Sequence, residues 1–201
     1  MELITNEMYS KLPNLILGFH GCGKDTYEKV LYEHQHLKKS ENEYDWLGNG
    51  IYFWENNYQR ARDWARNRYG EDGMVVGAVL DLGYCLNLTD YESTGILQMG
   101  YELLKEKCQD NDLPQNKMGR SKTDLLLRNL DCAVIQTVQS IYEKRGAEQY
   151  DSVRGVFTEG KPVYPGAGIV EKTHTQICIM NPNCIKGYFA PMERNEDYKM
   201  P

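Results

Sequence analysis

Hydrophobic and polar residues alternate in blocks along the first half of the chain. Residues 14–20 form an apolar run that ends in Gly-Cys-Gly, which predicts a short buried strand. Asp25, with Glu28 three residues later, has the pattern of a capping box and predicts a helix to about Leu37. The polar residues 38–49 then predict a loop.

The next block predicts a strand, a helix and a long strand. Residues 51–53 are apolar and aromatic, and Asn57 is suited to cap a helix that continues to about Tyr69. Residues 74–82 are rich in valine and leucine, and residues 85–89 continue this strand with a period of two.

The second half predicts two helices, a long irregular segment and two closing strands. The helices cover about 93–108 and 123–145, and the second carries an apolar stripe at helical spacing, formed by Leu126, Leu130, Val134, Ile135 and Val138. Residues 150–172 hold several glycines and prolines, and a loop of this length in a compact domain is usually functional. Strands at 175–180 and 184–190 follow. Strands at both ends with helices between them indicate a single α+β domain over residues 1–201.

Composition limits the class of protein. The 201 residues are 41% hydrophobic, and no run approaches the roughly 18 apolar residues of a membrane span. The polar residues 1–14 do not resemble a signal peptide, so we expect a cytoplasmic protein with no membrane partner. The net charge of −6 argues against a nucleic-acid binder that uses its whole surface. The six cysteines show no metal-ligand spacing, and we expect no metal.

Two short segments carry candidate chemistry. His20 ends the first strand and is followed by Gly21, so its imidazole and the next backbone amide can face one ligand. Residues 48–54 place three aromatic residues after two glycines, and strand alternation directs Tyr52 to the face opposite its two neighbours. Taken separately, a lone histidine such as His20 is more often a structural hydrogen-bonding residue, and aromatic residues on a strand are more often core packing.

The order of these segments is similar to that of a known family. His20-Gly21 on a first strand, then a helix, then Gly-Asn-Gly-Ile-Tyr-Phe at 48–53 resembles the catalytic core of poly(ADP-ribose) polymerases and related ADP-ribosyltransferases of the diphtheria-toxin type. The strand at 77–83, which runs from glycine to glycine, and the late strand at 175–179 extend the resemblance. It implies a pair of split, mostly antiparallel sheets around an NAD cleft, with residues 93–145 as a helical insertion.

The resemblance also implies roles for individual residues. His20 would donate or accept a hydrogen bond at a ribose hydroxyl of NAD, the backbone of Gly21 would hold the carboxamide, and Tyr52 would stack on the nicotinamide. Trp64 is expected to supply a second stacking face. Arg60 lies near a serine position of the family and is expected to help bind NAD.

The catalytic glutamate of the family is replaced by Gln176. An amide can hydrogen-bond a hydroxyl but cannot take up a proton, so Gln176 predicts transfer of a single ADP-ribose unit and requires another base. Glu159, in the segment before the closing strands, is the first candidate, and Glu171 and His174 follow it. Arg154 is expected to clamp a phosphate or carboxylate of the substrate. Each could instead be a solvated loop residue or part of a structural ion pair.

These expectations define three functional hypotheses. The first is an NAD-dependent mono-ADP-ribosyltransferase acting on a protein or nucleic acid, with NAD as co-substrate. The others are an NAD glycohydrolase and a non-catalytic module that binds NAD or ADP-ribose. A small transferase of this kind suits a toxin or defence effector, which would need a neutralising partner protein. Arginines of the predicted second helix would hold NAD phosphates or a nucleic-acid backbone if they line the cleft, and otherwise form a solvated face: Arg60, Arg62, Arg66 and Arg68.

Overall fold

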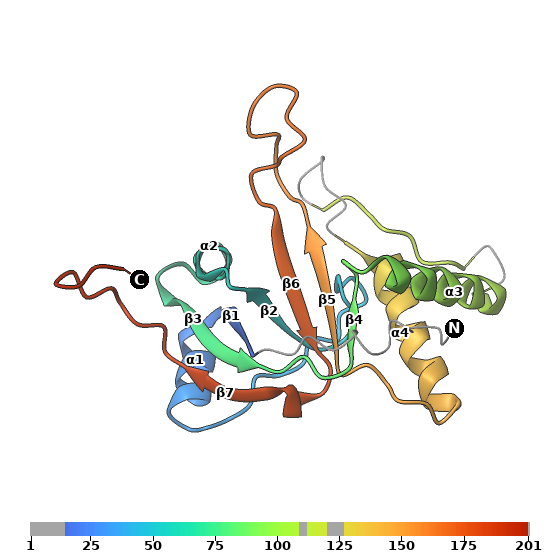
Figure 1. Ribbon diagram of the computed structural model, residues 1–201, viewed down its shortest axis with the longest axis horizontal. Helices are drawn as coiled ribbons and strands as arrows, with labels where there is room; N and C mark the ends of the chain where they lie inside the picture. Colours follow the sequence, from blue (N-terminus) through green and yellow to red (C-terminus); the bar gives the residue numbers. More distant parts are fainter. Residues whose placement is uncertain (1–14, 109–111, 120–126, 201) are drawn as a thin grey trace, which may run out of the picture.

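The computed structural model describes residues 15–108, 112–119 and 127–200 and has a mixed α+β architecture (Figure 1). Within this part of the chain, one sheet contains β1 Ile16–Gly23, β2 Ile51–Glu55, β3 Gly73–Leu80, β4 Cys85–Asn87, β5 Ser152–Phe157, β6 His174–Ile179 and β7 Ile185–Phe189. The helices are α1 Lys24–Leu31, α2 Tyr58–Tyr69, α3 Tyr91–Cys108 and α4 Asn129–Lys144. The predicted α+β class is confirmed.

The strands form a single sheet, in the order β4-β5-β6-β2-β1-β3-β7, rather than the expected pair of separate sheets. All neighbouring strands are antiparallel except β4 and β5, which are parallel. The join between β1 and β2 is narrow, because only Gly18 pairs with Glu55 and Phe19 with Trp54, whereas β1 pairs with β3 along its whole length. Beyond Phe19 the two halves of the sheet therefore separate. His20 is the first residue of β1 after this point.

The helices pack on the two ends of the sheet. α1 and α2 pack against β1 and β3, while α3 and α4 pack on each other beside β4 and β5 (Figure 1). Ile135 and Val138 of α4 are buried with Leu86 of β4 and Val153 of β5. The stripe predicted for this helix is thus core at Val134, Ile135 and Val138, whereas Leu126 lies outside the described residues.

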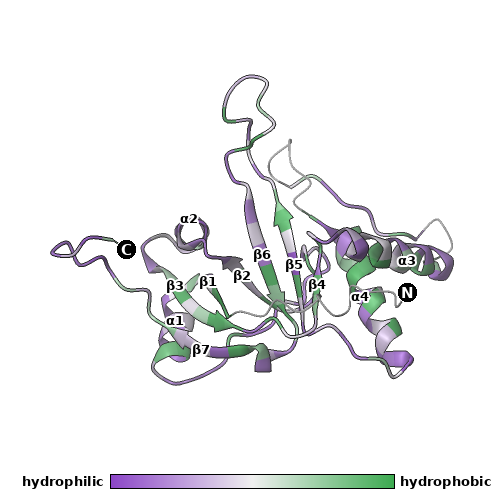
Figure 2. Cartoon of the chain, viewed as in Figure 1, coloured by the Kyte–Doolittle hydropathy of each residue, from purple (hydrophilic) through white to green (hydrophobic). Residues whose placement is uncertain are grey.

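The core follows the sheet. The side chains of Phe53, Leu80 and Ile177 are completely buried in one cluster, and Cys22 and Val30 close its edge near α1. Figure 2 shows the same pattern, with hydrophobic colour concentrated on the strands and on α4. No helix in the described ranges is long and apolar enough to span a bilayer.

Several element boundaries differ from the sequence predictions. β1 continues through the glycines to Gly23, which is the N-cap of α1, so Asp25 is not a capping residue but forms an ion pair with Lys29. α1 ends at Leu31, six residues before the predicted Leu37. Asn57 caps α2 as predicted, since its side chain accepts a hydrogen bond from the backbone N–H of Arg60.

The segment 150–172 is only partly irregular. Its first part forms β5, which the sequence analysis missed, and the rest forms an arm that returns to β6. The arm is held by main-chain hydrogen bonds, such as that from Lys172 N–H to the Glu159 carbonyl, and projects from the sheet beyond β5 and β6 (Figure 1). Residues 85–89 also do not continue β3, because β4 pairs with β5 at the other end of the sheet.

Candidate functional site

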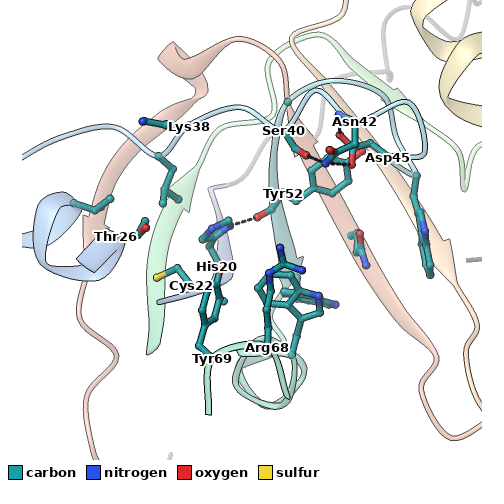
Figure 3. Close-up of a pocket in the computed structure, with 18 of the residues that line it drawn as sticks. His20, Cys22, Thr26, Lys38, Ser40, Asn42, Asp45, Tyr52, Arg68 and Tyr69 are labelled. Carbon is teal, nitrogen blue, oxygen red and sulfur yellow. Dashed lines mark hydrogen bonds between the residues drawn. The ribbon is translucent and has the colours of Figure 1, made fainter. Parts of the chain in front are cut away.

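A cleft of about 740 Å³ opens between α1, α2 and the ends of β1, β2 and β6 (Figure 3). Seven of the eight site residues predicted from the sequence line it: His20, Gly21, Tyr52, Arg60, Trp64, Glu159 and Gln176. They come from four elements and from the arm, and are separated by up to 156 positions of sequence, from 20 to 176. The eighth, Arg154, lies outside the cleft.

His20 is fixed where β1 and β2 separate. Its Nδ1 lies 2.8 Å from the main-chain oxygen of Tyr52, and because a carbonyl only accepts, Nδ1 carries the proton (Figure 3). Burial lowers the pKa of His20 below its usual value, and this effect outweighs the hydrogen bond, which raises it. The imidazole is therefore neutral at pH 7, and its Nε2 is an acceptor.

The hydroxyl of Tyr52 is occupied by hydrogen bonds to the chain, so its ring is the part available to the cleft. The hydroxyl accepts a hydrogen bond from Leu47 N–H at 2.8 Å and donates one to the Gly48 carbonyl at 2.7 Å. Burial raises the pKa of Tyr52 above its usual value, so the phenol stays protonated. Gly48 has a φ of +82°, which glycine adopts without strain, and the tyrosine hydroxyl holds this turn at the cleft edge.

Gln176 lies on the same face of the sheet as Tyr52. In the β2–β6 ladder Gln176 is directly opposite Trp54, two residues along the strand from Tyr52, and side chains two apart share a face. Gln176 Nε2 lies 2.9 Å from Nε2 of His174, whose side chain is fully buried behind it. Gln176 is thus part of the cleft wall.

The arm brings Glu159 to the same place. A carboxylate oxygen of Glu159 lies 3.2 Å from a guanidinium nitrogen of Arg60 on α2 and 3.7 Å from His174 Nε2. Only 14% of the Arg60 side chain and 18% of the Glu159 side chain are exposed. The Glu159 carboxylate, the His20 imidazole and the Gln176 amide therefore line the cleft, and the buried His174 lies behind Gln176.

One wall of the cleft is built from aromatic rings and arginines. The Arg60 guanidinium lies 5.9 Å from the Trp54 ring, Trp54 contacts Trp64, and Arg68 lies over both Trp64 and Tyr69. A wall of aromatic rings and arginines favours ligands that are planar and anionic.

Gly21 allows α2 to approach β1, since a Cβ at this position would lie 2.6 Å from the backbone oxygen of Ala61.

Arg154 has a structural environment instead of the expected substrate contact. Gly155 is directly opposite Gln176 in the β5–β6 ladder, so the neighbouring Arg154 faces the other side of the sheet. There its Nε and one terminal nitrogen bind both carboxylate oxygens of Glu55 at 2.5 and 3.0 Å. Asn87 and Thr89 accept further hydrogen bonds from it.

Part of the cleft lining was not predicted from the sequence. Trp54 forms the wall between Arg60 and Trp64, and its placement follows from the same period-two alternation that placed Tyr52. The loop before β2 adds Ser40, Asn42 and Asp45, which are connected by hydrogen bonds, and a loop of this kind has no periodic signal (Figure 3).

The cysteine in the cleft is not a reactive thiolate. Cys22 lines the cleft, but burial raises its pKa to about 11, so it is a neutral thiol at pH 7. Over residues 15–108, 112–119 and 127–200, no three histidine, cysteine or acidic side chains are grouped as a metal site would require.

Comparison with known proteins gives no assignment: no family model matches the chain, and no curated protein is significantly similar in sequence. The geometry of the cleft is therefore the basis on which a function can be inferred.

Proposed function

We propose that the protein is an NAD-dependent mono-ADP-ribosyltransferase whose cleft binds NAD as co-substrate. The observation that carries this proposal is that His20 and Tyr52, 32 positions apart, are joined by a hydrogen bond and line one cleft with Gln176 and Glu159. The fold proposed is that of the ADP-ribosyltransferases. The narrow β1–β2 junction supports it, because it divides the sheet into two halves beside the cleft, as that fold requires.

The binding roles follow from the states of the side chains. The neutral His20 offers Nε2 as an acceptor to a ribose hydroxyl, while its Nδ1–H remains bound to the sheet. Tyr52 offers an immobilised ring to the nicotinamide, and offset stacking on a planar ring contributes about 1 kcal/mol. Trp64 and Arg60 line the same cleft, where they can contact the same dinucleotide.

The transfer step needs charge stabilisation and a base. The bond between nicotinamide and ribose C1′ breaks, its electron pair leaves with nicotinamide, and positive charge develops on the sugar. A nucleophilic oxygen or nitrogen of the acceptor then bonds to C1′ and gives its proton to the carboxylate of Glu159. Gln176 contributes a hydrogen bond but no charge. The negative charge near the reacting sugar therefore comes from Glu159, which is paired with Arg60.

The acceptor proposed is a macromolecule, either protein or nucleic acid. A toxin or defence role in the cytoplasm, with a neutralising partner protein, belongs to the same proposal. The support is that Glu159 lies at the base of the arm that projects from the sheet, and that Val163, Tyr164 and Ile169 of this arm are exposed to a partner.

Labelled NAD tests the proposal. The wild-type protein is incubated with NAD carrying ³²P in the adenylate phosphate and a cell extract, and nicotinamide is measured while protein, RNA and DNA are counted separately. We expect nicotinamide release with label in one macromolecular fraction. Free ADP-ribose alone would identify a glycohydrolase, and NAD binding without nicotinamide release would identify a binding module.

A matched pair of variants assigns the activity to the cleft. His20→Asn keeps a donor toward the Tyr52 carbonyl but removes the acceptor Nε2, and we expect nicotinamide release to fall about a hundredfold. His34→Asn changes an exposed histidine that does not line the cleft, and it should match wild type. Equal activity of the two variants would refute the assignment of His20.

A further inference from the structure

The hydrogen bonds around His174 determine which end of the Gln176 amide is available to a ligand. His174 Nδ1 lies 2.7 Å from the main-chain oxygen of Lys172, which can only accept. Nδ1 therefore carries the proton. In the neutral ring Nε2 then has a lone pair, and only the NH₂ end of the neighbouring amide can donate to it, at the observed 2.9 Å.

The surroundings of His174 favour this neutral form. Its side chain is fully buried among the rings of Trp46, Trp54 and Phe157. Burial lowers the pKa of His174, and the positive charge of Arg60 lowers it further, whereas the Lys172 carbonyl and Glu159 act in the opposite direction. Arg60 and Glu159 are the charged side chains that act on it, and they are paired with each other.

We propose that His174 is a positioning residue: its neutral imidazole binds the NH₂ group of Gln176 and so keeps the amide oxygen Oε1 available to the ligand in the cleft. His174 itself does not line the cleft, so it acts through Gln176. Through this bond a glutamine presents an acceptor, as a carboxylate would, and can bind a ribose hydroxyl of NAD. A freely rotating amide would present its donor end for part of the time.

The same arrangement has a pH dependence. When His174 gains a proton, Nε2 becomes a donor, and it can bind Glu159, 3.7 Å away, or the oxygen of Gln176. The amide then reverses and presents NH₂ to the cleft. Binding of a ribose hydroxyl through Gln176 is therefore lost as the pH falls through the pKa of His174, which lies below the usual value for histidine.

Two substitutions separate positioning from packing. His174→Phe keeps an aromatic ring among Trp46, Trp54 and Phe157 but removes the acceptor. His174→Gln keeps an oxygen acceptor near the position of Nε2 and removes the ring. A merely structural role predicts that the phenylalanine variant is the better one, whereas the positioning role predicts the reverse.

The test has one measurement without substrate and one with it. Long-range ¹H–¹⁵N spectra of the wild-type protein should show His174 protonated at Nδ1 and not at Nε2, and the side-chain amide signal of Gln176 should shift in His174→Phe. A proton on Nε2 at pH 7.5 would overturn the inference whatever the activity of the protein.

The second measurement depends on the function proposed above. We expect kcat/KM for nicotinamide release from NAD to fall about tenfold in His174→Phe and to return to within about threefold of wild type in His174→Gln. An unchanged kcat/KM in the phenylalanine variant, or equal losses in both, would overturn the positioning role. A wild-type protein that releases no nicotinamide would refute the proposed function, and the spectra would still decide the state of His174.

Discussion

The hydroxyl of Tyr52 should stabilise the protein, while its ring serves the cleft. Tyr52→Phe removes only the oxygen, which accepts from Leu47 N–H at 2.8 Å and donates to the Gly48 carbonyl at 2.7 Å. Leu47 is completely buried, so its N–H loses its partner without gaining water, at a cost of about 1–3 kcal/mol. The Gly48 carbonyl keeps a weak contact from the Cys178 thiol, so its loss is smaller. With about 2 kcal/mol for the Leu47 N–H and up to about 1 kcal/mol for the Gly48 carbonyl, the total is about 2–3 kcal/mol.

Urea denaturation measures this loss as a shift of the midpoint at constant slope. For a slope of about 2 kcal/mol per molar, the midpoint should fall by about 1–1.5 M. Tyr32→Phe is the matched control, since Tyr32 is 71% exposed, and its unfolding free energy should change by less than about 0.5 kcal/mol. A Tyr52→Phe protein as stable as this control would refute the view that the hydroxyl holds the turn at Gly48.

The same variant separates the two roles of the residue. Because the ring remains, NAD affinity should fall less than about tenfold in Tyr52→Phe, whereas Tyr52→Leu should lose the stacking contribution as well. Isothermal titration with NAD distinguishes the two variants, and equal affinities would contradict the stacking role.

Three further changes test other parts of the structure. Gly21→Ala places a Cβ 2.6 Å from a backbone oxygen of α2 and should lower the unfolding free energy by about 2 kcal/mol. Gly95→Ala has open space around an exposed helical site and should raise the unfolding free energy by about 0.5–1 kcal/mol. Thermal melting of the two variants checks this prediction, and similar shifts in both would contradict it. Arg154→Ala leaves Glu55, whose side chain is 17% exposed, without its ion-pair partner. The free energy of unfolding measured in urea should fall by about 2–4 kcal/mol, and nicotinamide release per folded molecule should not change. A selective loss of activity would show that Arg154 does contribute to the site. The folded-state pKa values of His20 and His174 lie below the unfolded value of about 6.5, so below that pH the unfolded chain binds more protons than the folded protein. The free energy of unfolding should therefore fall as the pH drops below about 6.5. An unfolding free energy that is constant from pH 7 to pH 5 would contradict the burial of these two residues as neutral rings.

The cleft was more predictable than the sheet. His20 and Tyr52 stand in short strands with strong local signals, and strand alternation alone assigns the face of Tyr52. The single sheet was not predictable, because only two residue pairs join β1 to β2, and pairing between distant strands leaves no local pattern. Strand β5 was hidden for the same reason: it is stabilised by β4 on one side and β6 on the other, within a segment whose glycines and prolines indicate a loop.

Arg154 and Gln176 show how register determines a role. Both were expected to contact the substrate, but the β5–β6 ladder places Gly155 opposite Gln176 and turns Arg154 to the opposite face. A shift of one residue reverses every side chain of a strand, and the sequence does not specify that register. The environment of Glu159 was equally hidden, since Arg60 lies 99 positions away in the chain.

A crystal structure with a non-hydrolysable NAD analogue, in which carbon replaces the ring oxygen of the nicotinamide ribose, tests the central claim most directly. We expect the nicotinamide against the Tyr52 ring, and His20 Nε2 within about 3 Å of a ribose hydroxyl. An analogue bound elsewhere on the molecule, or no binding at millimolar concentration, would contradict the assignment of this cleft to NAD.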